Sequence, residues 1–257
     1  MEIPRKPLPT RVDQTPDLPP AYAAALRRGL DDLGLDLSGD ARTAIDGHAR
    51  LLLAWTEAIN LTAIREPGAV ALAHVVDSLT AVPLLRERVI NRFVDIGSGG
   101  GYPGLPLAAA LPAARALLAE PIGKKAGFLR TAIAAVGLEG IAEAATVRAE
   151  ALARDPRHRG RWPAVTARAV AGLADLVELC FPLLAPGGML VAWKGGDLAV
   201  ELASAERAMD ALGGGQLDIR PVRVAGLEEH QLIVATVGGP VPAAYPRDPG
   251  TRKRRPW

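Results

Sequence analysis

Cysteine is almost absent from this chain of 257 residues, in which Cys180 is the single example. One thiol cannot form an intramolecular disulfide, so the chain is not a small secreted domain held together by disulfides. We expect a reducing, cytoplasmic location. Cys180 lies in the apolar segment 176–184 and is expected to pack there as a small apolar side chain.

Aromatic residues and long apolar runs are also scarce. Only 4% of the residues are aromatic although 49% are hydrophobic, so aliphatic side chains must fill the core of a globular protein. We find no apolar, uncharged window of about 18 residues, and therefore expect no membrane span. Residues 1–20 are polar and proline-rich, lack the apolar region of a secretory signal, and are predicted to be a disordered extension.

Charge of one sign does not dominate, since 30 basic residues stand against 28 acidic ones. The distribution is uneven, however. Residues 241–257 are predicted to be a basic C-terminal tail, in which five basic side chains accompany a single acidic one, Asp248. Such a tail can hold a polyanion by releasing its counterions. From charge alone it is equally compatible with a disordered, solvated chain end.

Helical periodicity dominates the chain before residue 91. Apolar residues recur at helical spacing over 20–37, from Ser38 or Asp40 to Ile59, and over 68–87. Either polar residue is suited to cap the second of these helices. Since no strand pattern interrupts them, we predict a helical cap over residues 21–90.

Short apolar runs alternate with helical segments from residue 91 to residue 240. This alternation predicts βαβ units, and hence an α/β, Rossmann-like domain with a mostly parallel sheet covered on both faces. The last two runs, 217–224 and 230–237, are joined without room for a helix. We therefore expect them to form an antiparallel pair at the edge of the sheet.

The strongest signal is the glycine-rich segment 94–104, which follows the first expected strand and opens a helix. Glycines let the backbone turn tightly and approach a ligand closely. Ligands of open α/β sheets bind at this edge, where the start of the helix offers free N–H groups. Gly97, Gly99 and Gly101 are therefore predicted to contact a cofactor. A turn without a ligand is disfavoured, because this glycine density costs conformational entropy without a return in packing.

Two carboxylates bear on the identity of the cofactor. Asp95, at the end of the first expected strand, suits the amino group in the methionine part of S-adenosylmethionine but would repel the pyrophosphate of a dinucleotide. Glu120 ends the second strand and can accept hydrogen bonds from the ribose hydroxyls of either cofactor. Asp95 therefore favours the methyl donor.

Two alternative functions remain open at this point. The first is a nicotinamide-dependent oxidoreductase with the same layout, against which Asp95 argues. The second is a non-catalytic RNA-binding ribosome assembly factor that keeps a vestigial donor pocket. The intact glycine loop, with Asp95 and Glu120, argues against loss of the donor pocket. A measurement of S-adenosylmethionine binding would separate the methyltransferase, the oxidoreductase and the assembly factor.

Further segments accompany the glycine loop, which ends in Gly101-Tyr102-Pro103-Gly104. They are Asn60-Leu61-Thr62-Ala63-Ile64, His74 with Asp77-Ser78-Leu79, Gly123-Lys124-Lys125, Phe128-Leu129-Arg130, Arg148-Ala149-Glu150, Ala167-Arg168-Ala169, Pro186-Gly187-Gly188, Lys194-Gly195, Tyr245-Pro246-Arg247 and Gly250-Thr251. Together these segments resemble the RsmG family, also called GidB, of bacterial small-subunit rRNA guanine-N7 methyltransferases. The resemblance covers roughly residues 45–255. The Asn-Leu-Thr segment and the end of the glycine loop are its most particular parts.

This resemblance implies a class I, S-adenosylmethionine-dependent methyltransferase fold with a seven-stranded sheet. It also implies methylation of a specific guanine of 16S rRNA at N7, with the rRNA or the small ribosomal subunit as partner. The implied donor contacts, besides the loop glycines and Glu120, are Tyr102, Ala149, Glu150 and Arg168. Arg168 is also the candidate for positioning the target. The implied RNA contacts are Lys124, Lys125, Arg130, Lys194, Arg247, Arg252, Lys253, Arg254 and Arg255.

The sequence departs from the family in two places. The family usually has aspartate followed by a small residue at the second strand end, where this chain has Glu120-Pro121. The extra methylene should keep the ribose contact. The second departure is a tail that is denser in positive charge than the family leads us to expect.

N7 chemistry needs no catalytic base, because guanine N7 carries a lone pair and no proton. Positioning therefore matters more than proton transfer, and the sequence shows no His–Asp or Cys–His arrangement of a catalytic base. N7 lies in the deep major groove of paired RNA, so the target must be unpaired or splayed out of its stack. Tyr102 or Trp193 could stack on a base, although Trp193 is more typical of a core residue.

Simpler interpretations apply to several polar residues. Arg168 could pair with a carboxylate, Lys194 could be solvated, and His74 with Asp77 is expected to form a structural pair on one helix face. The remaining histidines have no metal-site spacing, so we predict no metal. We expect a monomer.

Overall fold

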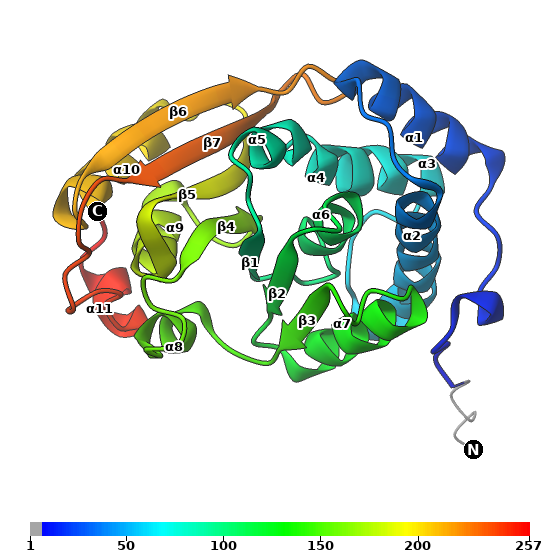
Figure 1. The fold of residues 1–257 in the computed structure, drawn as a ribbon, viewed down its shortest axis with the longest axis horizontal. Helices are drawn as coiled ribbons and strands as arrows, with labels where there is room; N and C mark the ends of the chain where they lie inside the picture. The colour runs from blue at the N-terminus through cyan, green and yellow to red at the C-terminus, as the bar shows by residue number, and fades with distance from the viewer. Residues whose placement is uncertain (1–6) are drawn as a thin grey trace.

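The computed structural model describes residues 7–257 and contains one seven-stranded sheet of order β3-β2-β1-β4-β5-β7-β6 (Figure 1). The strands are β1 (Arg92–Ile96), β2 (Arg115–Ala119), β3 (Ala142–Ala145), β4 (Trp162–Arg168), β5 (Leu184–Gly195), β6 (Gly215–Pro221) and β7 (His230–Val237). Strands β1 to β5 pair in parallel, and β7 runs antiparallel to both β5 and β6. The predicted mostly parallel sheet with an antiparallel edge pair is therefore confirmed.

Helices cover both faces of the sheet, as its strands require. They are α6 (Gly104–Ala110), α7 (Gly123–Ala135), α8 (Ala149–Arg154), α9 (Leu173–Cys180), which continues into the 3-10 turn η3 (Phe181–Leu183), and α10 (Ala199–Ala211). Successive strand residues point to opposite faces. Phe93 of β1 thus joins the apolar cluster under α6 and α7, and Val94 joins the cluster under α8, α9 and α10. Cys180 is fully buried in the second cluster, in the apolar role expected of it.

The chain before residue 91 is helical, as predicted. Its elements are the 3-10 turn η1 (Val12–Gln14), α1 (Pro20–Leu33), α2 (Gly39–Ile59), α3 (Pro67–Val70), the π-helical turn η2 (Ala71–Val76), α4 (Asp77–Leu79) and α5 (Val82–Glu87). Helix α1 ends before residue 37 because Gly34 adopts a left-handed conformation, with φ of 59°. Ser38 caps α2 by accepting a hydrogen bond from the N–H of Ala41 at 3.2 Å.

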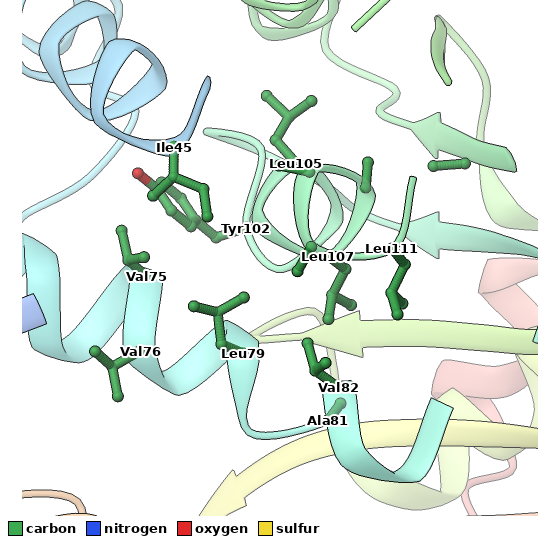
Figure 2. Packing of buried hydrophobic residues seen from close by; sticks show 14 of the residues in the cluster. Ile45, Val75, Val76, Leu79, Ala81, Val82, Tyr102, Leu105, Leu107 and Leu111 are labelled. Atoms are coloured by element: carbon green, nitrogen blue, oxygen red, sulfur yellow. The ribbon is translucent and has the colours of Figure 1, made fainter. Parts of the chain in front are cut away.

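These N-terminal helices share one core with the sheet. In Figure 2, Leu79 and Val82 of the cap lie close to Leu107 of α6, whereas Val75 of the cap and Leu105 of α6 lie farther apart. All five side chains are almost fully buried, and they belong to one apolar cluster that extends to the sheet. The predicted boundary at residue 90 therefore marks a change in periodicity, whereas the packing continues across it.

The helical stretch 67–87 is more apolar than we expected for any segment of this chain. By length and composition it could cross a membrane, although we expected no such segment. In this fold, 61% of its most apolar window is buried inside the protein. A core helix passes the same compositional test, and Val75, Val76 and Leu79 pack in the core.

The start of the described chain lies along α2 and is not the disordered extension that we expected. Trp55 Nε1 donates a hydrogen bond to the carbonyl of Pro9 at 2.7 Å, and Arg50 Nε donates to Thr15 Oγ1 at 3.1 Å. Residues 1–6 of the predicted extension lie outside the described residues.

The basic tail also has a defined position. It forms a further helix, α11 (Pro249–Arg254), which lies beside α8 in Figure 1. Arg247 and Trp257 both donate hydrogen bonds to Glu178 of α9, and Arg252 pairs with Glu150 of α8 at 2.6 Å. The charge run alone did not reveal these contacts, because the two carboxylates are distant in the sequence.

Candidate functional site

A pocket of about 310 Å³ opens at the carboxyl edge of the sheet, next to the ends of β1, β2 and β4. It is lined by Leu52, Leu61, Thr62, His74, Gly97, Ser98, Gly99, Gly100, Tyr102, Glu120, Pro121, Ile122, Lys125, Arg168, Ala169 and Val170. The structure thus brings the glycine loop, Glu120 and Arg168 together. The cap adds Thr62, to which the sequence assigned no role. A larger hollow of about 940 Å³ reaches the opposite ends of β1 and β2 and contains no residue of the glycine loop.

Glu120 connects the loops that follow β1 and β2. Its Oε2 accepts a hydrogen bond from the N–H of Gly99 at 2.9 Å, and its Oε1 accepts one from the N–H of Ile122 at 2.8 Å. A carboxylate offers about four acceptor positions, so two remain for other donors. The arrangement fits the predicted ribose contact, since a ribose presents two hydroxyl donors.

Asp95 supports the glycine loop from beneath and does not line the pocket. Its fully buried carboxylate accepts hydrogen bonds from Thr166 Oγ1 at 2.8 Å and from the N–H of Gly104 at 3.2 Å. A Cβ at residue 104 would lie 2.8 Å from Asp95 Oδ2, so glycine is required for this approach. Both oxygens thus hold the fold, and a contact of Asp95 with the amino group of the donor stays a prediction.

Burial gives Asp95 an unusual titration. Desolvation raises its pKa from 3.8 to about 6, although hydrogen bonds from Ser98 and Thr166 oppose this rise. A folded-state pKa above the unfolded value means that the native state binds the proton more tightly. The resulting stabilisation is complete below pH 3.8 and is lost as the pH rises through 6.

Asp95→Asn should remove this pH dependence, since asparagine still offers an acceptor to Gly104 and does not titrate. Between pH 4 and 7, the free energy of unfolding of the variant should rise relative to wild type by up to about 3 kcal/mol, at about 1.36 kcal/mol per pKa unit. Urea denaturation of both proteins across this pH range measures the difference in their free energies of unfolding. The titration of the histidines contributes equally to both proteins and cancels in this difference. Parallel pH profiles would show that Asp95 does not titrate in this way.

Tyr102 stacks with two histidine rings. Its ring centroid is 4.5 Å from that of His48 and 4.9 Å from that of His74, and both pairs are stacked. His48 Nε2 is also hydrogen-bonded to the carbonyl of Gly100 at 2.7 Å. Tyr102 therefore joins the cap to the glycine loop. Tyr102 is 6% exposed, so little of its ring is open to a base in this conformation, and stacking on a base stays a prediction.

Arg168 is held at the pocket by the cap. Its Nη1 donates to Asp77 Oδ2 at 2.8 Å and to the carbonyl of Ala73, in the π-helical turn, at 2.9 Å. Its Nη2 lies 3.2 Å from His74 Nδ1. The expected direct pair of His74 and Asp77 is thus replaced by a bridge through Arg168. Asp77 also binds His230 Nδ1 through its other oxygen, at 2.9 Å.

Two predicted donor contacts lie away from the residues that line the pocket. Ala149 and Glu150 begin α8, and Glu150 Oε1 accepts a hydrogen bond from Arg252 at 2.6 Å. Burial alone would raise the pKa of Glu150, but the hydrogen bond and charge of Arg252 outweigh it and lower the pKa. Contact with the donor stays a prediction for both residues.

The predicted RNA contacts fall into two groups. Lys124 and Arg130 are exposed on α7, and Lys125 of the same helix lines the pocket. Lys194, in contrast, pairs with Glu201 at 2.6 Å. Its neighbour Trp193 is 5% exposed and donates a hydrogen bond to the carbonyl of Asp77, which confirms the core interpretation.

The strand order, the glycine loop after β1 and the carboxylate that ends β2 define a class I methyltransferase. Two solved structures share this fold. A Bacillus cereus O-methyltransferase in complex with SAH has a TM-score of 0.55 at 15% identity, over 80% of this chain and 94% of that chain. The CMeT domain of the citrinin polyketide synthase has a TM-score of 0.52 at 13% identity, over 87% of this chain and 66% of that chain.

Sequence relatives identify the family. The family model of GidB, rRNA small subunit methyltransferase G, matches residues 42–231. Proteins named "Ribosomal RNA small subunit methyltransferase G" are similar over most of their length. The protein from Roseiflexus sp. (strain RS-1) is 44% identical over 80% of this chain and 87% of its own, and that from Deinococcus radiodurans is 40% identical over 93% and 94%. The chain belongs to this family.

The chain is therefore a methyltransferase, and its methyl donor is S-adenosylmethionine. The alternative of a nicotinamide-dependent oxidoreductase is wrong. The pocket fits the donor, because Glu120 keeps acceptor positions for ribose hydroxyls and the backbone of the loop can approach closely at Gly99.

Proposed function

We propose that this chain methylates N7 of a specific guanine in the 16S rRNA of the small ribosomal subunit, in the cytoplasm. The name that the relatives carry supports the rRNA of the small subunit as substrate class. The observation that carries the N7 assignment is that the histidine and the carboxylate of the pocket are each held by hydrogen bonds, so neither is placed as a general base. Both ring nitrogens of His74 and both oxygens of Glu120 are hydrogen-bonded. Guanine N7 suits such a site, because it has no proton to be removed.

The residues of the pocket would act by positioning. The bound donor supplies a methyl group on a positively charged sulfonium. Asp77, which is 2% exposed, pairs with Arg168 and offsets the guanidinium charge that would otherwise repel this sulfonium. The glycine loop and Glu120 hold the donor, and the cap residues form the opposite wall against which a splayed guanine would be placed.

The proposed RNA surface consists of exposed or half-buried basic side chains that form no ion pair within the described residues. On α7 these are Lys124, Lys125 and Arg130, and in the tail they are Lys253, Arg254 and Arg255. It excludes Lys194, Arg247 and Arg252, which pair with Glu201, Glu178 and Glu150. We propose a monomer as the active form.

Methyl transfer to purified subunits tests the proposed function. Small ribosomal subunits from a strain that lacks this gene would be incubated with the protein and labelled S-adenosylmethionine, and the modified base would be mapped. We expect one 7-methylguanine in the 16S rRNA. Label at another atom or base would overturn the N7 assignment. No incorporation, with the donor still bound, would show that the acceptor is a different molecule.

The exposed residues of the tail give a separate prediction for RNA binding. Replacing Lys253, Arg254 and Arg255 with alanine should weaken affinity for 16S rRNA. Three lost phosphate contacts should reduce the slope of log Kobs against log salt by about 2, at about 0.7 per contact with single-stranded RNA. The control replaces Arg27 and Arg28, which are exposed on α1, a helix that lies far from α11 in Figure 1. Equal slopes for both variants would exclude the tail from the RNA surface.

A further inference from the structure

The hydrogen bonds around His74 determine which ring nitrogen carries its proton. Arg168 Nη2 lies 3.2 Å from His74 Nδ1, and a guanidinium only donates hydrogen bonds, so Nδ1 is the acceptor. Burial, together with the charge of Arg168, lowers the pKa of His74 to about 4, so the ring is neutral at pH 7. Its single proton is therefore on Nε2, which lies 2.6 Å from Thr62 Oγ1.

Thr62 accepts this hydrogen bond and a second one. The N–H of Ile64 donates to the same oxygen at 3.0 Å. A hydroxyl oxygen has two lone pairs, so both are occupied and only the hydroxyl proton is left to bond. Within residues 7–257 no acceptor for that proton is found. Because Thr62 lines the pocket, its hydroxyl is left as a donor to whatever the pocket holds.

Residues that do not contact Thr62 determine that its hydroxyl donates a hydrogen bond. Asp77 is 2% exposed and holds Arg168 through a 2.8 Å ion pair. Arg168 has a second anchor in the carbonyl of Ala73. Were the proton on His74 Nδ1, it would face a guanidinium N–H, and two donors would oppose each other. The series of contacts from Asp77 through Arg168 to His74 thus leaves the Thr62 hydroxyl able only to donate a hydrogen bond to a ligand.

We propose that Thr62 selects guanine at the methylated position by donating a hydrogen bond to guanine O6. The inference rests on the proposed function. Guanine presents N7 and O6 side by side as acceptors, whereas adenine presents the N6 amino donor next to N7. An adenine amino group would meet a hydroxyl whose lone pairs are both occupied. Thr62 is then a specificity-determining residue, and His74 and Arg168 are positioning residues that act through it.

Removal of the O6 acceptor from the base, combined with removal of the hydroxyl from Thr62, tests this contact. Small subunits would be reconstituted from ligated 16S rRNA that carries guanine or 2-aminopurine at the mapped position. The analogue keeps N7, has hydrogen in place of O6, and carries no proton on N1. Single-turnover methylation rates with excess enzyme would be measured for wild type, Thr62→Val and Thr62→Ser. The guanine-to-analogue rate ratio is compared between enzymes, so the intrinsic reactivity of each base cancels.

We expect the rate ratio of wild type to exceed that of Thr62→Val by about tenfold or more, the size of one lost hydrogen bond that leaves a group unpaired. Thr62→Ser keeps the hydroxyl and should keep the wild-type ratio. Donor affinity and thermal unfolding of each variant show whether the pocket is intact, and Thr62→Ala replaces the valine variant if that one does not fold. The proposal is overturned if removal of the hydroxyl lowers both rates by the same factor, because a structural role predicts that result. Wild type that fails to methylate guanine-containing subunits would refute the proposed function itself.

Discussion

Gly99→Asp is expected to lower the affinity for S-adenosylmethionine by at least about 100-fold, equivalent to about 2.7 kcal/mol. Gly99 has a φ of +52°, which costs a residue with a side chain roughly 1–2 kcal/mol. A Cβ there would have only the carbonyl oxygen of Gly97 nearby, at 3.8 Å, so the new side chain would occupy open space at the pocket. Its carboxylate would also approach Glu120, whose Oε2 is 2.9 Å from the N–H of Gly99, and like charges repel.

Isothermal titration calorimetry with S-adenosylmethionine measures this loss, and Gly137→Asp is the matched control. Gly137 follows α7 with a φ of +72°, and a Cβ there meets no atom within 4 Å. The control variant therefore has similar backbone strain and the same added charge, outside the pocket. We expect it to bind the donor like wild type. Equal affinities for the two variants would mean that the donor binds elsewhere.

Arg247→Ala is expected to destabilise the fold by about 3–5 kcal/mol, the range for an ion pair broken so that a buried charge remains. The Glu178 side chain is fully buried, and its Oε2 lies 2.6 Å from Arg247 Nη2. Burial alone would raise the pKa of Glu178, but hydrogen bonds from Arg247 and Trp257 outweigh it and lower the pKa. Without the guanidinium, the carboxylate would keep its desolvation cost and lose most of its compensation.

Urea denaturation at pH 7 measures this free energy of unfolding. Arg255→Ala is the control, because Arg255 belongs to the same tail and its side chain is exposed. A surface substitution of this kind should change stability by less than about 0.5 kcal/mol. If Arg247→Ala behaves like Arg255→Ala, the tail is not anchored on Glu178 in solution.

Sequence periodicity was sufficient for the sheet. The alternation of strands and helices predicted parallel β1 to β5, and the missing helix before β7 predicted its antiparallel pairing. These features depend on local repeats of two or 3.6 residues, which a single sequence displays directly. The glycine loop was equally visible, because its composition is unusual at every position.

Polar contacts were not predictable in the same way. The position of Asp95 at a strand end was correct, but the direction of its side chain depends on Thr166 and Gly104, which belong to other elements. Thr62 and His74 stood in segments that resemble the family, yet their roles depend on Arg168, which is distant in the sequence. Such partners follow no period, so only the folded chain reveals them.

Because the cap and the sheet share one continuous core, the cap cannot be exchanged between enzymes as a separate part. Ile45, Val75 and Leu79 of the cap are almost fully buried in the same cluster as Leu105 and Phe128. A cut or exchange at residue 90 would expose apolar surface on both sides, so the cap is not an interchangeable module. The part of the chain proposed to select the base and the part that holds the methyl donor share one hydrophobic core, so a change in one must remain compatible with the packing of the other.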